Sequence, residues 1–324
     1  MDSVLSRWSR TRSADSVFGL GLGYYVPMPA KRSVNDNPAP EPEVIASMSG
    51  IADLVARYDV VLLDAYGVLV NSAGLMPNAR TLVDAITGQG RGFFVVTNDA
   101  SRLPQTLTAR FQRFGLPIPA EAFITTGSLL PGYFADNALV GARCMVLGPA
   151  DSESYVRAAG GQVVPVEAGQ DCDAVVVCDE AGFSFLDTLD NVLSALYRHF
   201  DRGDQVALIQ PNPDLIYPKG NNAYGFTSGA ITLILEAALA RRYPGRDLLF
   251  ARLGKPHRPI FDQARRLAGT DSLLMIGDQL ETDIAGARAA GIDAALVTTG
   301  VSRWDPSLHN DSPSPGRPTH VIRF

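Results

Sequence analysis

The sequence predicts an α/β fold, a doubly wound parallel sheet with an inserted α/β domain. From Tyr58 onward, short apolar runs alternate with segments of helical periodicity, which is typical of strand–helix–strand units. The runs are continuously apolar, as expected for parallel strands that helices cover on both faces. The length of 324 residues is enough for about two domains.

The predicted strands of the first sheet lie toward the two ends of the chain. They are residues 60–63, 93–96, 273–276 and 294–297. Helical periodicity follows the first two strands over residues 82–86 and 103–114, and Gly88 and Gly115 are placed to end those helices. Residues 319–322 are predicted to form a last edge strand.

A second alternating stretch occupies the middle of the chain. Its predicted strands are residues 144–147, 163–166, 174–177 and 206–209, and amphipathic helices are predicted over 189–197 and 231–239. The predicted organisation is an irregular extension (1–42), a discontinuous core (43–137 and 250–324) and an inserted domain (138–249). The site of the core would then be assembled from residues on both sides of the insertion.

Composition excludes several classes of protein. The net charge is −6, so no broad cationic surface for nucleic acid is expected. No apolar run reaches 18 residues, so no membrane-spanning helix is expected. Cys144, Cys172 and Cys178 form no C-x-x-C pair and are too few for a disulfide framework. We therefore expect a cytoplasmic enzyme with buried, unreactive thiols.

Polar residues follow the predicted core strands at the points where these end. Asp64 follows the first strand, Thr97 and Asn98 follow the second, and Asp278 follows the third. In open parallel sheets, ligands bind beyond the carboxyl ends of the strands. Periodicity alone thus predicts one site from these side chains.

Four segments of the chain extend this pattern. They are Asp64-Ala65-Tyr66-Gly67-Val68-Leu69, Val96-Thr97-Asn98-Asp99, Gly254-Lys255-Pro256 and Gly277-Asp278-Gln279-Leu280-Glu281-Thr282-Asp283-Ile284-Ala285-Gly286-Ala287. In this order they resemble the four motifs of the haloacid dehalogenase-like (HAD) hydrolase superfamily, over residues 55–305. The spacing is similar to that of subfamily IIA, the nitrophenylphosphatase-like and nucleotide- and sugar-phosphate phosphatases, whose Rossmann-like core carries a C2-type α/β cap.

The resemblance implies a phosphatase that acts on a small phosphorylated metabolite. Asp64 would attack phosphorus and form an aspartyl-phosphate that water hydrolyses. Mg²⁺, which prefers oxygen ligands, would be held by Asp64, the backbone carbonyl of Tyr66 and Asp278, with Asp283 either bound through water or supporting the direct ligands from outside. Lys255 would bridge the nucleophile and the phosphate.

The resemblance also implies which residues bind the substrate. Thr97 and the amide of Asn98 would bind the phosphoryl oxygens. The segment 210–214 resembles the Asn-Pro-Asp loop of this cap type, which would bring Asn212 and Asp214 over the site as substrate-binding residues. Caps of this type often pair, so a homodimer through the cap remains open.

Tyr66 departs from the pattern of the superfamily's phosphatases. These usually carry a second aspartate at this position, which protonates the leaving oxygen and later activates water. Loss of a general acid typically costs about 10²–10⁴-fold in rate. A tyrosine hydroxyl is a weak acid, so as a catalytic residue Tyr66 would support only a slow activity, or the activity would be directed to good leaving groups.

Two alternatives stay open. The Asp-Ala-Tyr-Gly string also resembles the first motif of L-2-haloacid dehalogenases, in which the aspartate at the position of Asp64 attacks a carbon atom. Those enzymes carry a helical cap between the first two motifs, whereas here the long insertion lies between Thr97 and Lys255, which favours phosphoryl chemistry. The other alternative is a phosphate-binding protein with degenerate catalysis.

Overall fold

The computed structural model describes residues 41–220, 223–299, 302 and 316–323. The core elements are β1 (Glu43–Ile45), α1 (Met48–Val55), β2 (Val60–Leu63), β3 (Val70–Asn71), β4 (Gly74–Leu75), α2 (Ala79–Gly88), β5 (Gly92–Thr97), α3 (Pro104–Arg113), η1 (Ala120–Ala122), β6 (Phe123–Thr125), η2 (Gly127–Leu129), α4 (Leu130–Asp136), α8 (Arg258–Ala268), β14 (Leu273–Gly277), the π-helix η3 (Leu280–Ile284), α9 (Ala285–Ala289), β15 (Asp293–Val297) and β16 (His320–Ile322).

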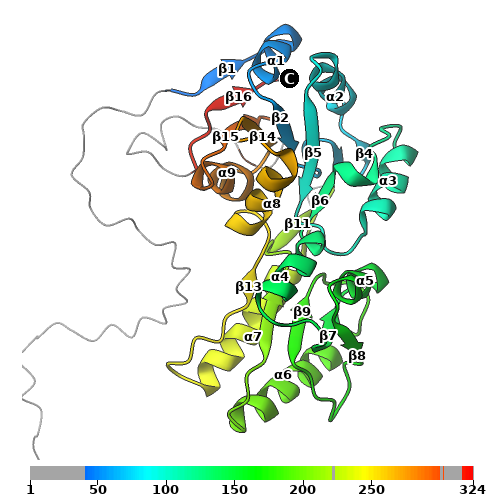
Figure 1. Cartoon of the computed structure of the whole chain (residues 1–324), viewed down its shortest axis with the longest axis vertical. Coiled ribbons are helices and arrows are strands. Elements are labelled where there is room, and N and C mark those ends of the chain that lie inside the picture. The colour runs from blue at the N-terminus through cyan, green and yellow to red at the C-terminus, as the bar shows by residue number, and fades with distance from the viewer. Residues whose placement is uncertain (1–40, 221–222, 300–301, 303–315, 324) are drawn as a thin grey trace, which may run out of the picture. The chain divides into compact units, whose positions relative to one another are not determined.

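The inserted elements form a second sheet. They are β7 (Arg143–Leu147), α5 (Ala150–Ala158), β8 (Gln162–Val164), β9 (Ala174–Val177), α6 (Phe185–Asp201), β10 (Ala207–Gln210), β11 (Ile216–Gly220), β12 (Ala223–Phe226), α7 (Ser228–Arg242) and β13 (Ala251–Arg252). The core sheet has the order β1-β16-β15-β14-β2-β5-β6 and the inserted sheet the order β13-β10-β9-β7-β8. The strand pairs of both sheets are parallel. In Figure 1 the colours of the inserted elements run from green to yellow, because in chain order these elements stand between the two parts of the core.

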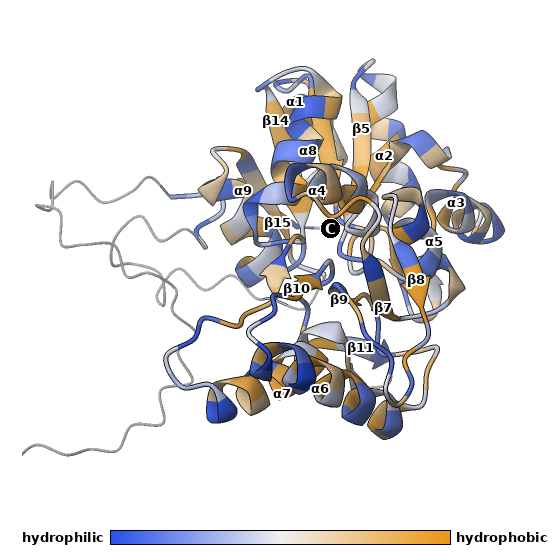
Figure 2. Ribbon diagram, turned by 60° about the horizontal axis from the view of Figure 1, so that its bottom comes forward, coloured by the Kyte–Doolittle hydropathy of each residue, from blue (hydrophilic) through white to orange (hydrophobic). Residues whose placement is uncertain are grey.

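Strand β2 shows why the core strands are continuously apolar. Val61 and Leu63 pack into one cluster with side chains of α1, α2 and α3, whereas Leu62 packs into another with α8 and α9. Successive side chains of a strand point to opposite faces of its sheet, and helices cover both faces here. Figure 2 shows the result in β5 and β14, which carry the hydrophobic colour over most of their length.

Strand β7 follows the same rule in the inserted sheet. Met145 and Leu147 pack with α6 and α7, while Cys144 and Val146 pack with α5. The cluster that holds Cys144 also contains Leu62 of the core sheet, so apolar packing is continuous between core and insertion. Burial raises the pKa of the Cys144 thiol to about 11, in agreement with an unreactive thiol.

The predicted α/β class and the predicted strands are confirmed, with one correction. The strand over His320–Ile322 is not an edge strand, because β1 pairs with it in parallel register (Figure 1, where the blue β1 lies beside the red β16). Strand β1 was not predicted, because a strand of three residues that follows a proline-rich segment shows no detectable periodicity. The pairing of β13 with β10 extends the inserted sheet two residues past position 250, where the second core segment was predicted to begin.

Two further expectations concern the rest of the chain. The predicted irregular extension of residues 1–42 lies outside the described residues except for its last two positions. Within the described ranges, no helix is long and apolar enough to cross a membrane.

Candidate active site

Three neighbouring strands of the core sheet bring the predicted site residues together. Asp64 follows β2, Thr97 ends β5, and Asp278 follows β14. Strand β2 pairs with both β5 and β14 in parallel, so the carboxyl ends of all three strands meet at one edge of the sheet. The amide of Asp64 donates to the carbonyl of Ile276 at 2.9 Å, which continues the pairing up to the site.

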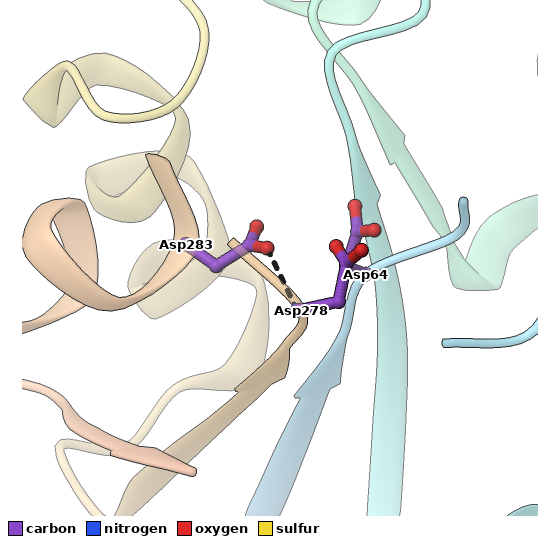
Figure 3. A group of neighbouring side chains, drawn as sticks. All are labelled: Asp64, Asp278 and Asp283. Carbon is purple, nitrogen blue, oxygen red and sulfur yellow. Dashed lines mark hydrogen bonds between the residues drawn. The ribbon is translucent and has the colours of Figure 1, made fainter. Parts of the chain in front are cut away.

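A group of three buried carboxylates lies at this edge (Figure 3). One carboxylate oxygen from each of Asp64, Asp278 and Asp283 lies within 4.8 Å of the other two. Asp283 comes from η3, and its Oδ2 accepts the backbone N–H groups of Asp278 and Gln279, both at 3.2 Å. These two hydrogen bonds hold the Asp283 carboxylate toward the strand end that carries Asp278.

Lys255 places a buried ammonium against the same carboxylates. Its Nζ donates to Oδ1 of Asp64 and, at 2.6 Å, to Oδ1 of Asp283. Burial alone lowers the pKa of Lys255, but the charges of Asp283 and Asp64 outweigh it, and the pKa is raised. The lysine is therefore a fixed cation at neutral pH.

The carboxylates outnumber the cation that faces them. Burial raises the pKa of Asp64 well above its ordinary value; Lys255 opposes this, and the charges of Asp283 and Asp278 add to it. Buried like charges are unfavourable unless opposite charge compensates them. One ammonium leaves the group of three carboxylates with excess negative charge, and a divalent cation would balance it.

The local backbone also fits a bound cation. A Cβ at Gly67 would lie 2.2 Å from Oδ2 of Asp278, so only glycine lets the loop after Asp64 approach this carboxylate. Gly67 also has a φ of +97°, which glycine adopts without strain. An all-oxygen donor set of this kind suits Mg²⁺.

A small cavity of about 70 Å³ opens beside Asp64. Its lining comes from the core and from the insertion: Asp64, Tyr66, Thr97, Asn98, Asp99, Asp214, Lys255, Gln279 and Thr282. Since about 10–15 Å³ by this measure holds one water, the cavity has room for a group of several atoms, such as a phosphoryl group.

Three lining residues were not predicted from the sequence. Asp99 directly follows Asn98, and Gln279 and Thr282 lie between Asp278 and Asp283 of the last motif. Their positions within the recognised motifs were the available signal. Asn212 was predicted to bind substrate, but it is not among the residues that line this cavity. Its Oδ1 instead accepts the amide of Asp214 at 3.0 Å, which shapes the loop.

The Tyr66 hydroxyl has a partner in the insertion. It donates to the backbone carbonyl of Pro218 in β11 at 2.7 Å. A phenol has one proton to donate, and here that proton is held by a carbonyl oxygen. Tyr66 thus connects the loop after Asp64 to the β11–β12 hairpin, and it does so at the position where the phosphatases that the sequence resembles usually carry a second aspartate.

Asn98 joins the core to the loop that carries Asp214. Its Nδ2 donates to Oδ1 of Asp214 and to the carbonyl of Lys255, both at 2.9 Å, and its Oδ1 accepts the amide of Lys255 at 2.7 Å. Burial raises the pKa of Asp214 to about 6, although the hydrogen bond from Asn98 and the charge of Lys255 lower it.

Comparisons with known proteins identify the family. A family model described as haloacid dehalogenase-like hydrolase matches residues 61–162, and one described as HAD-hydrolase-like matches residues 252–323. The crystal structure of a possible sugar phosphatase of the HAD superfamily from Cytophaga hutchinsonii is 30% identical, with a TM-score of 0.73, over 87% of this chain and 97% of that chain. The protein belongs to the haloacid dehalogenase-like hydrolase superfamily.

Other relatives of this HAD-like hydrolase are phosphatases by name. The dihydroxyacetone phosphatase of Corynebacterium glutamicum is 27% identical over 81% of this chain and 87% of its own length. A glycerol phosphate phosphatase from Mycobacterium tuberculosis, solved in complex with magnesium, is 25% identical with a TM-score of 0.66, over 82% of this chain and 75% of that chain.

Proposed function

We propose that this HAD-like hydrolase is a Mg²⁺-dependent phosphatase that acts on a small phosphorylated metabolite through an aspartyl-phosphate at Asp64. The observation that carries the proposal is the convergence of Asp64, Asp278, Asp283 and Lys255 beside one small cavity. The names of the relatives support the same reaction class.

The chain's own residues supply the nucleophile and most of the binding groups. An oxygen of Asp64 attacks phosphorus, the bond from phosphorus to the leaving oxygen breaks, and its electron pair goes to that oxygen. Thr97 and the amide of Asn98 bind the phosphoryl oxygens, and Lys255 holds positive charge beside Asp64 throughout. Water then attacks the aspartyl-phosphate and returns the Asp64 carboxylate.

The metal site would consist of Asp64, Asp278 and the backbone carbonyl of Tyr66. Asp283 would act through water, because both of its carboxylate oxygens already accept hydrogen bonds from the protein. A bound Mg²⁺ would neutralise charge on the phosphoryl group, which lets an anionic nucleophile approach it.

The position of the insertion argues against the dehalogenase alternative. Between β2 and β5 the chain forms only the short β3–β4 hairpin and α2, with no cap. The inserted sheet instead follows α4, and its loop supplies Asp214 to the cavity. Haloacids moreover carry no phosphoryl group, so their hydrolysis would need no cation to neutralise phosphoryl charge.

The test uses the full chain with a panel of phosphate esters, acetyl phosphate and 2-haloacids, with and without Mg²⁺. We expect phosphate release that requires Mg²⁺ and that falls on the order of 10³-fold or more in Asp64→Asn. The matched control, Asp187→Asn, replaces an exposed carboxylate of α6 that accepts a hydrogen bond from Ser184 and should retain activity.

Each alternative has its own outcome. Halide release without Mg²⁺ would support the dehalogenase. Tight binding of inorganic phosphate without turnover of any ester would support a degenerate binding protein. Undiminished phosphate release by Asp64→Asn would contradict the assigned nucleophile.

A further inference from the structure

Tyr66 leaves the proposed reaction without a proton donor at the expected position. An alkoxide is a poor leaving group, so turnover of alkyl phosphates needs an acid beside the leaving oxygen. The Tyr66 hydroxyl is engaged by the Pro218 carbonyl. Unless another group provides the proton, substrates would be confined to esters with good leaving groups.

We propose that Asp214 of the inserted domain is the general acid and base of this enzyme. It would take the role of the second aspartate, whose position is occupied here by Tyr66. This inference rests on the proposed function. Asp214 lines the same small cavity as the nucleophile Asp64. It is the one carboxylate that the insertion contributes to that lining among the described residues.

The contacts of the Asp214 side chain leave one oxygen available. Oδ1 accepts from Asn98 Nδ2 at 2.9 Å, while among the described residues Oδ2 has no hydrogen-bond partner. Asn98 itself cannot turn away, because its amide also donates to and its oxygen accepts from the backbone of Lys255. The fixed bond at Oδ1 therefore makes Oδ2 the oxygen that would carry the transferred proton.

The backbone holds Asp214 in place from both sides. Its amide donates to Oδ1 of Asn212, and its carbonyl accepts the amide of Gly229 at 2.9 Å. A Cβ at Gly229 would lie 2.4 Å from that carbonyl, and one at Gly254 would lie 2.7 Å from Cδ of Pro213. The loop that carries Asp214 thus packs so closely against the start of α7 and against the segment before Lys255 that glycine is needed at both positions.

Charges around Asp214 suit a group that gains and loses a proton. Burial raises its pKa to about 6, Asn98 and Lys255 lower it, and Asp283 raises it. Asp64 and Asp99 line the same cavity. An acid with a pKa near the working pH is available in both protonation states, as general acid–base catalysis needs.

The proton balance closes over the two steps. When the bond from phosphorus to the leaving oxygen breaks, Asp214 gives its proton to that oxygen, and an alcohol departs while the bond from Asp64 to phosphorus forms. Asp214, now a carboxylate, takes a proton from water as the water oxygen attacks phosphorus. The bond to Asp64 breaks, hydrogen phosphate leaves, and Asp214 is protonated again.

The test compares leaving groups in Asp214→Asn, which keeps an acceptor for Asn98 but cannot transfer a proton. With Mg²⁺ present, we expect kcat/KM for glycerol phosphate to fall about 10²–10⁴-fold. For p-nitrophenyl phosphate, whose leaving group needs no proton, we expect a fall of less than about 10-fold. The wild-type rate for glycerol phosphate should also fall as pH rises through about 6, and the variant should lack this limb.

Three further variants make the result decisive. Tyr66→Asp in the Asp214→Asn background should restore turnover of glycerol phosphate, because it returns a carboxyl group to the position expected by resemblance. Tyr66→Phe should not steepen the dependence on the leaving group. Asp187→Asn is the surface control, and thermal melts should show that each variant folds.

Several outcomes would overturn the inference. Equal losses for both substrates in Asp214→Asn would make Asp214 a positioning residue. A leaving-group dependence that Tyr66→Phe steepens and Asp214→Asn does not would assign the proton to Tyr66. Both results leave the phosphatase intact, whereas absence of phosphate release from every ester in the wild-type protein would contradict the proposed function together with this inference.

Discussion

At the scale of single residues, the site depends on which side chains reach the edge where the strands end. Asp64, Thr97 and Asp278 could be predicted because parallel strands bring their carboxyl ends to one place. The contact of Tyr66 with Pro218 could not, because it joins positions far apart in the chain through a backbone carbonyl. No residue type in the sequence signals such a partner.

Gly67 carries the first prediction at this scale. In Gly67→Ala the new Cβ would lie 2.2 Å from Oδ2 of Asp278, so the carboxylate must move, in addition to the strain at a φ of +97°. We expect a loss of about 1–3 kcal/mol in the free energy of unfolding. We also expect Mg²⁺ to raise the melting temperature of the wild-type protein but not that of Gly67→Ala.

Gly90→Ala is the matched control for that prediction. Gly90 also has a positive φ, +67°, but nothing lies within 4 Å of its Cβ position. The control should therefore show strain alone and keep the response to Mg²⁺. The same Mg²⁺ response in Gly67→Ala as in Gly90→Ala would contradict the role given to the loop after Asp64.

At the scale of elements, long apolar strands were predictable and short polar ones were not. The residues that form β9 are all buried, and their continuously apolar sequence predicts a buried strand. The β11–β12 hairpin was missed, because Pro218 and Gly220 interrupt its first strand and Ile216 and Phe226 are exposed. No apolar periodicity marks such a hairpin, although its Pro218 carbonyl meets the site.

Tyr66→Phe tests how this hairpin is held. Removal of the hydroxyl deletes the hydrogen bond to the Pro218 carbonyl and keeps the aromatic ring. A hydrogen bond of this kind contributes about 0.5–1.5 kcal/mol, so amide exchange in the β11–β12 hairpin should become about 2–10-fold faster. Hydrogen–deuterium exchange with mass spectrometry measures it.

The control makes the same chemical change elsewhere. The Tyr58 hydroxyl donates to Oδ2 of Asp293 at 2.9 Å within the core, so Tyr58→Phe should leave exchange in the hairpin unchanged. If the two variants leave the hairpin equally protected, the Tyr66 hydroxyl does not hold it.

At the scale of the whole described molecule, the insertion is joined to the core by more than its two chain crossings. Helix α5 of the insertion is hydrogen-bonded to the core. The Ser152 hydroxyl donates to the Ala100 carbonyl at 2.8 Å, and the Tyr155 hydroxyl donates to the Arg102 carbonyl at 2.7 Å. The apolar cluster around α5 continues into the core sheet. The sequence pattern predicts a core and an inserted domain, but a pattern does not report how strongly the two parts adhere.

This continuity predicts that core and insertion unfold together. Because separation of the two parts would expose the cluster, calorimetry of the full chain should show one transition, with equal calorimetric and van't Hoff enthalpies.

Tyr155→Ala should weaken the coupling between core and insertion, since it removes a buried ring and its hydrogen bond to the core, at a cost of about 3–5 kcal/mol. We expect its transition to broaden or divide in two. Tyr197→Ala, which removes a ring from the α6 cluster inside the insertion, should lower the melting temperature and keep one transition. Two transitions in the wild-type protein would show instead that the insertion folds independently.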